Sequence, residues 1–156
     1  MILNGKAVQK AFVNKLKDIS TMLVELKFYQ SLLRLPAQVL TYQDSCHLRN
    51  VMGVSDDPRS LLKAIEGVEF RETKDSDRCC GSAGIYNIVE SEMSMQILDH
   101  KMENVKASHA TTIVTANPGC LLQMKLGIER EGLSDKLRAV HIVDLLLEAA
   151  EYAQRI

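Results

Sequence analysis

The chain has 156 residues, of which 46% are hydrophobic and 25% charged, proportions typical of one soluble globular domain. Its 19 Lys and Arg residues nearly balance its 20 Asp and Glu residues, and the net charge of −1 argues against general attraction to nucleic acid or to anionic lipid. No apolar run approaches the roughly 18 residues that span a bilayer, and no secretory signal pattern begins the chain, so we expect a cytoplasmic protein without a transmembrane segment.

Residues 1–36 are predicted to form an N-terminal helical segment. Apolar residues recur at three- and four-residue spacing over 6–34, with lysines between them, and Pro36 is expected to end this helix. The core of a single domain is expected over 38–150. Its first strand is predicted over 38–43, and a polar turn that contains Cys46 follows.

The next part of the chain is predicted to add one helix and one strand. Pro58 suits the first turn of a helix that continues to about Glu66, and Gly67 is expected to close that helix in the left-handed conformation. A short strand is predicted over 68–71. A charged loop over 74–78 then leads to Cys79 and Cys80.

The second half of the chain repeats the alternation of helix and strand. Helices are predicted to open at Gly81 and to cover 91–107, 118–131 and 143–154, with strands over 111–116 and 139–142. Asn117 is predicted to cap the helix that starts at Pro118. This order predicts an α/β fold, a Rossmann-like parallel sheet of about four strands with helices on both faces.

The only four cysteines follow the first three predicted strands: Cys46, Cys79, Cys80 and Cys120. Parallel strands end at one edge of a sheet, and ligands bind beyond that edge where the order of the strands reverses. Thiolates are soft ligands that suit thiophilic metals and iron–sulfur clusters. We therefore expect all four cysteines to bind a metal or a cofactor.

Four neighbouring residues are expected to surround these ligands. His47 and Arg78 stand beside cysteines and would offset the negative charge of a thiolate site. Gly81 gives room for the backbone to approach a bulky group. Asn117 is a helix cap and, together with His47, a candidate to complete the ligand set. Hydrogen bonds from such residues to sulfur tune reduction potentials.

Three other interpretations of the cysteines remain open at the level of sequence. Four thiolates form a closed tetrahedral zinc site in many structural or docking modules, although the chain lacks the usual Cys-x-x-Cys pairs. Cys79 and Cys80 would alternatively cycle as a vicinal dithiol, at the cost of a strained disulfide ring. Free cysteines are also commonly buried as small hydrophobic residues.

The sequences at 42–49, 77–87 and 115–120 resemble the cysteine-rich CCG domain family, and they are most similar to the C-terminal part of the glycolate oxidase iron–sulfur subunit. The resemblance implies an iron–sulfur cluster, expected as 4Fe–4S, on Cys46, Cys79, Cys80 and Cys120, with zinc as the alternative. One position departs from the family, because fuller motifs end in Cys-x-x-Cys and Asn117 stands at the first of these two positions.

The resemblance also implies a role and partners. The chain would be a piece of a longer iron–sulfur subunit and would lack a preceding ferredoxin-like domain. It would be a non-catalytic electron-transfer module of a glycolate (2-hydroxy acid) oxidase or dehydrogenase complex. Electrons would pass from flavin-containing subunits toward a membrane acceptor, at the inner face of the plasma membrane.

Overall fold

A four-stranded parallel sheet forms the centre of the protein. The computed structural model describes residues 10, 12, 13 and 15–155. The strands lie in the order β2-β1-β3-β4, and each neighbouring pair is parallel. Their bounds are β1 (Arg34–Gln43), β2 (Glu66–Phe70), β3 (Thr112–Thr115) and β4 (Arg138–His141). The predicted fold class is confirmed.

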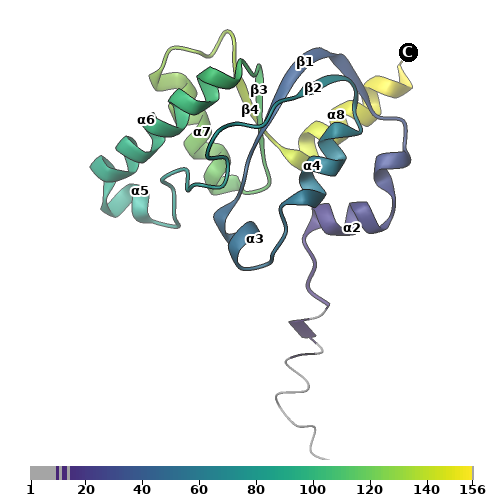
Figure 1. Cartoon of the computed structure of the whole chain (residues 1–156), viewed down its shortest axis with the longest axis horizontal. Helices are drawn as coiled ribbons and strands as arrows, with labels where there is room; N and C mark the ends of the chain where they lie inside the picture. Colours follow the sequence, from purple (N-terminus) through teal and green to yellow (C-terminus); the bar gives the residue numbers. More distant parts are fainter. Residues whose placement is uncertain (1–9, 11, 14, 156) are drawn as a thin grey trace, which may run out of the picture.

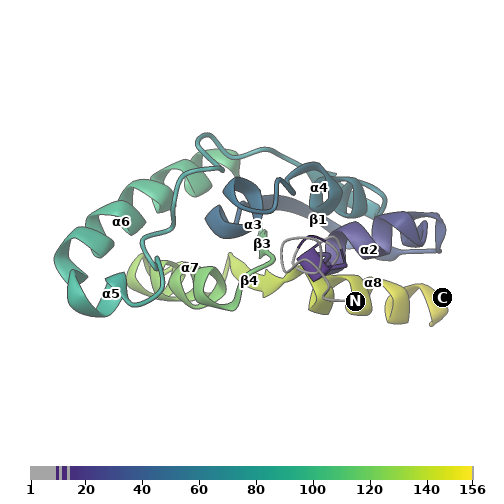
Figure 2. The same cartoon turned by 90° about the horizontal axis from the view of Figure 1, so that it is seen from below.

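Helices cover both faces of this sheet, as Figures 1 and 2 show from two directions. One face carries α2 (Ile19–Glu25), α4 (Asp56–Lys63) and α8 (Ile142–Gln154), and the other carries α6 (Ser91–Ser108) and α7 (Pro118–Arg130). Three short helices lie in the connections: η1 (Phe28–Gln30), α3 (Cys46–Asn50) and α5 (Tyr86–Val89). Among the described residues, no helix has both the length and the apolar character needed to cross a bilayer.

The register of β1 and β3 divides the buried side chains between two hydrophobic clusters. Tyr42 lies opposite Val114, and both contribute to the cluster that α4 and α8 cover. Ile113, one position earlier on β3, contributes to the second cluster with Leu98 and Met124 from α6 and α7. Successive side chains of a strand point to opposite faces, so β3 contributes one residue to each cluster through its neighbouring positions Ile113 and Val114.

The N-terminal segment differs from the sequence prediction of one helix over 6–34. Residues 16–18 are not helical, and α2 begins at Ile19 with Asp18 as its N-cap, which accepts a hydrogen bond from the Ser20 N–H at 2.8 Å. A side chain that caps a new helix competes with continuation of an earlier one. Residues 6–9, 11 and 14 of the predicted helix lie outside the described residues.

Pro36 and Gly67 also have roles other than those predicted. Pro36 lies inside β1, where the register against β2 shifts between Arg34 and Gln38, and a register shift tolerates a residue without an N–H. Gly67 lies within β2 and not at the end of α4. Its φ is +86°, and a Cβ there would lie 2.2 Å from the Leu35 carbonyl oxygen, so close approach of β1 and β2 requires glycine.

The predicted helix at Gly81 is also wrong. Gly81 and Gly84 have φ of +95° and +70°, which α-helices do not accommodate, and α5 begins only at Tyr86. The segment from Arg71 to Ile85 therefore forms one long connection that carries Cys79 and Cys80 past the end of the sheet.

Candidate cofactor site

The site lies where the connections of the sheet diverge. The chain leaves β1 toward β2 at one edge, and it leaves β3 toward β4 at the other, so the point between β1 and β3 is the topological switch point of the sheet. Cys46 begins α3 directly after β1, and Cys120 lies in the first turn of α7 after β3. The long connection after β2 brings Cys79 and Cys80 to the same place.

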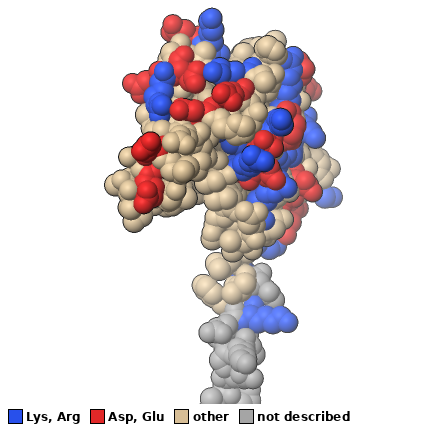
Figure 3. Space-filling model, turned by 60° about the vertical axis from the view of Figure 1, so that its left-hand side comes forward, with Lys and Arg blue, Asp and Glu red and all other residues tan. Residues whose placement is uncertain are grey.

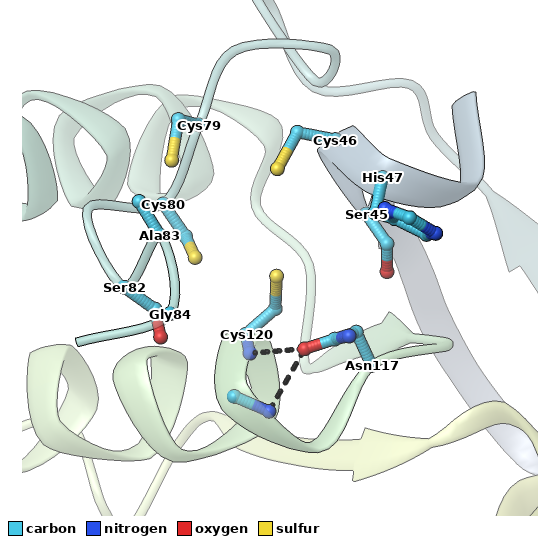
Figure 4. A pocket seen from close by; sticks show the side chains of 11 residues that line it. Ser45, Cys46, His47, Cys79, Cys80, Ser82, Ala83, Gly84, Asn117 and Cys120 are labelled. Atoms are coloured by element: carbon cyan, nitrogen blue, oxygen red, sulfur yellow. Dashed lines mark hydrogen bonds between the residues drawn. The ribbon is translucent and has the colours of Figure 1, made fainter. Parts of the chain in front are cut away.

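The four cysteines border one pocket of about 200 Å³. Figure 4 shows their sulfur atoms directed toward a common space. All four thiols are free; Cys80 and Cys120 are buried, whereas Cys46 and Cys79 are partly exposed. The remaining lining residues are Ser45, His47, Ser82, Ala83, Gly84, Asn117 and Gly119. The structure therefore brings together residues that lie far apart in the sequence.

Asn117 fixes the position of Cys120. Its Oδ1 accepts hydrogen bonds from the N–H groups of Gly119 at 2.9 Å and Cys120 at 3.1 Å, and Pro118 occupies the first turn of α7. The predicted cap is confirmed. Its consequence is that Cys120 is held at the N-terminal end of a helix, where unpaired N–H groups and the helix dipole favour a thiolate.

The buried thiols influence one another's ionisation. The Cys80 thiol, acting as a hydrogen-bond donor, lowers the pKa of Cys120, although burial opposes this change. The same interaction with Cys120 raises the pKa of Cys80 to about 11. Interaction with Cys80, together with burial, also raises the pKa of Cys79. Of Cys79, Cys80 and Cys120, only Cys120 has a lowered pKa and is therefore the one that most readily becomes a thiolate.

Of the four neighbours predicted from sequence, two line the pocket, and Gly81 and Arg78 do not. His47 and Asn117 line it, and the Gly81 N–H donates to the Cys79 sulfur at 3.4 Å. Arg78 lies outside this lining. Its side chain is 66% exposed, its Nε lies 3.8 Å from a carboxylate oxygen of Asp75, and it borders a neighbouring pocket instead.

Ser45 is a pocket residue that the sequence pattern did not indicate. It is only 3% exposed, and its hydroxyl has no hydrogen-bond partner among the described residues. It precedes α3 in the N-cap position but makes no capping bond. Figure 4 shows its oxygen directed into the pocket. A serine before a helix normally suggests a cap, so only the three-dimensional arrangement reveals that this hydroxyl lies near Cys120 and helps to lower the pKa of that thiol.

The donor set suits a bulky sulfur-rich group better than one small ion. Across residues 10, 12, 13 and 15–155, no group of three or more His, Cys, Asp or Glu side chains is arranged so as to hold a single metal ion. The four thiols instead surround a hollow, and the unpartnered Ser45 hydroxyl is available to donate to whatever fills it. An iron–sulfur cluster, with thiolate ligands and sulfide acceptors, fits this chemistry.

An ion-pair network anchors the segments that carry the cysteines. The buried carboxylate of Asp44 accepts from Arg59 at 2.8 Å and from Arg49 at 2.9 Å. The Asp44 N–H donates to the Ser76 carbonyl at 3.1 Å, and Arg59 also pairs with Glu72 at 2.6 Å. The network thus joins the end of β1, helix α4 and the connection that precedes Cys79.

The surface beside the pocket is apolar. Exposed large hydrophobic residues lie just before α5, on α5 and at the start of α6, next to the lining residue Gly84: Ile85, Ile88, Val89 and Met93. Figure 3 shows few charged atoms on the lower part of the folded domain and interspersed positive and negative groups above it. This face thus carries no large patch of positive or of negative charge.

The fold and the pocket define the class of protein: a parallel α/β domain with a cysteine-lined site at its switch point. The chain belongs to the cysteine-rich domain family, CCG, whose sequence pattern matches residues 40–125. This match confirms the resemblance seen in the three cysteine motifs.

Several known proteins are similar to the chain. The probable glycolate oxidase iron–sulfur subunit of Bacillus subtilis is 72% identical over 141 residues, which are 90% of this chain and 32% of that protein. Lactate utilization protein A of Oceanobacillus iheyensis is 32% identical over 85% of this chain and 54% of its own length. One subunit of the fumarate reductase (CoM/CoB) of Methanothermobacter marburgensis is 35% identical over 69% of this chain and 22% of its own length. The chain thus spans from about a fifth to about half of these relatives.

Proposed function

We propose that this chain is an iron–sulfur electron-transfer module in which Cys46, Cys79, Cys80 and Cys120 hold the cluster. The observation that carries the proposal is the convergence of all four thiols, from three separate connections, on one pocket. When bound, a cluster of this kind takes up and releases single electrons. The chain itself would not be the catalytic subunit.

We further propose that the module serves a glycolate, or similar 2-hydroxy acid, oxidase or dehydrogenase complex. The name of the Bacillus subtilis relative supports this assignment. Electrons would arrive from a flavin-containing subunit and continue toward a membrane acceptor, at the cytoplasmic side of the plasma membrane. The rest of a longer subunit, including a ferredoxin-like domain, would complete the path.

The residues around the pocket would stabilise the thiolates in complementary ways. The N-terminus of α7 favours negative charge at Cys120, the Gly81 N–H donates to the Cys79 sulfur, and the Ser45 hydroxyl is free to donate to sulfur. Donors of this kind favour the more negative, reduced state and therefore raise the reduction potential of a cluster.

We favour a 4Fe–4S cluster over zinc for two reasons. The adjacent Cys79 and Cys80 are awkward for one compact ion but are able to reach different irons, and the thiols surround a hollow of about 200 Å³. Closed tetrahedral zinc sites instead hold four ligands about 2.3 Å from one ion.

The experiment that tests the proposal is anaerobic reconstitution of the protein followed by iron, acid-labile sulfide and zinc analysis of the same sample. An electron paramagnetic resonance spectrum after reduction completes it. We expect iron and sulfide in matched amounts and a signal that appears on reduction. Stoichiometric zinc with neither sulfide nor a redox signal would overturn the proposal and identify a structural metal module.

The Cys80→Ser variant tests the ligand set. Cys80 is buried and interacts with both Cys79 and Cys120. Its replacement by serine removes one of four thiolate ligands, and we therefore expect cluster uptake to be abolished. The matched control is Ser82→Ala, which changes another lining residue without removing a sulfur. Wild-type iron and sulfide content in Cys80→Ser would remove Cys80 from the ligands.

A further inference from the structure

Lys101 is a buried cation without an anionic partner. It lies on α6, faces the connection that carries Asp75 and Cys79, and is 2% exposed. Its ammonium group donates to the backbone carbonyl of Asp75. Within the part of the chain that the structure describes, no carboxylate lies at ion-pair distance from it. The Asp75 carboxylate lies instead near Arg78 and His100, at 3.8 and 3.7 Å.

Such an arrangement is costly in the cofactor-free protein. A buried ammonium needs an opposite charge or several good acceptors, and one neutral carbonyl supplies little compensation. Burial accordingly lowers the pKa of Lys101, whereas the nearby Cys80 and Asp75 favour its charged form. The question is which negative charge the side chain is placed to meet.

Two of the four cysteines lie close to this lysine. Lys101 and Cys79 line a second pocket, of about 310 Å³, and Cys79 also lines the pocket of the four cysteines, so it lies between the two. Cys80 belongs to the same hydrophobic cluster as Leu98 and Met102, which neighbour Lys101 on α6. Lys101 thus lies next to two of the four proposed ligands, Cys79 and Cys80, on the side away from the pocket that the four cysteines share.

We infer that Lys101 is the built-in counter-charge of the thiolate-held cluster and raises its reduction potential. The inference rests on the proposed function. Four thiolates with a cluster carry net negative charge, and reduction adds one more electron. A fixed positive charge in a low-dielectric interior stabilises the reduced form more than the oxidised form. Lys101 would therefore change the reduction potential through its fixed charge, without being a ligand of the cluster.

The test compares reduction potentials of reconstituted variants by spectroelectrochemical titration. Lys101→Gln removes the charge but keeps a donor for the Asp75 carbonyl, and Lys101→Met removes both. We expect both variants to have more negative potentials than the wild type. The control is Lys106→Gln, on the same helix but exposed and paired with Glu131 at 2.7 Å, which should keep the wild-type potential.

A second measurement separates charge from simple support of the loop. Without cofactor, Lys101→Met should unfold at a higher denaturant concentration than the wild type, because an unpaired buried charge has been removed. If Lys101 instead served mainly to hold the Asp75 loop in place, Lys101→Met would unfold at a lower denaturant concentration than the wild type. If Lys101→Met does not fold, Lys101→Gln still decides the question.

The outcomes distinguish this inference from the proposed function. Wild-type protein that takes up no iron and sulfide contradicts the function itself. Wild-type protein that loads normally, together with Lys101→Gln at an unchanged potential, contradicts only the counter-charge. A shift in Lys101→Met alone would assign the effect to the hydrogen bond with Asp75 and would likewise overturn the inference.

Discussion

Asn117 links helix formation to the geometry of the cysteine pocket. Its side chain accepts from the N–H groups of Gly119 and Cys120, and the same residue lines the pocket. A thiol-bearing residue at this position would lose the amide cap. The amide therefore favours the stability of α7 at a place where fuller versions of the family motif have a further cysteine.

Replacing Asn117 should weaken the start of α7. We expect Asn117→Ala to lower the free energy of unfolding by about 1 kcal/mol, since two N–H groups lose their acceptor. Asn117→Ser keeps a capping oxygen and should lie close to the wild type. Urea unfolding of the cofactor-free proteins measures both, and equal midpoints for Ala and wild type would contradict a capping role.

At the scale of elements, Asp44 joins the strand that leads to Cys46 with the helix and connection that lie before Cys79. Its carboxylate is almost fully buried, and Arg59, which pairs with it, is only 13% exposed. Arg59 also lies over the ring of Tyr42, 5.2 Å from its centre. Buried pairs of this kind are costly to break, because the remaining charge stays buried.

Removing the charge of Asp44 should therefore destabilise the protein. We expect Asp44→Asn to lower the free energy of unfolding by about 3 kcal/mol, since Arg59 and Arg49 lose their shared acceptor. The control is Glu148→Gln, which breaks an exposed pair with Arg138 and should change stability by less than about 1 kcal/mol. Similar midpoints for the two variants in urea unfolding would show that the network is not stabilising.

The helices and strands that are determined by their own residues were predictable from the sequence. The cap and first turn of α7 follow from Asn117 and Pro118 alone, and the strand at Thr112–Thr115 follows from its β-branched residues. Pro36 and Gly67 were misassigned because their roles depend on how β1 meets β2, a contact between distant segments.

The site was predictable in outline for a similar reason. The order of strands and helices alone places the cysteines at one edge of a parallel sheet. Ser45 and Lys101 were missed because a serine before a helix suggests a cap, and a lysine on an amphipathic helix suggests solvent. Their burial arises from packing against other elements, which periodicity does not encode.

At the scale of the whole molecule, two hydrophobic clusters share one sheet. Strands β1 and β3 each pair on both sides, whereas β2 and β4 lie at the edges. Helices cover the two central strands on both faces. Helix α5, in contrast, is a single exposed turn at the margin of the pocket, with no buried residue.

Native-state hydrogen exchange should follow this arrangement. We expect the amides of residues 40–42 and 112–115 to exchange most slowly, with opening free energies close to that of global unfolding. The amides of 86–89 should exchange fastest among the helices. Mass spectrometry or NMR on the cofactor-free protein measures both groups of amides. If the amides of β1 exchanged as fast as those of α5, the central strands would not unfold only together with the whole domain, and the prediction would be wrong.

The long separation of the cysteines has a consequence for biosynthesis. Cys46 leaves the ribosome first, and Cys120 follows on the order of ten seconds later at ordinary rates of translation. Strand β3, which lies beside β1 at the middle of the sheet, arrives just before Cys120. A nascent chain therefore presents three of the four cysteines of the pocket before the fourth has been synthesised, and the complete pocket exists only late in synthesis.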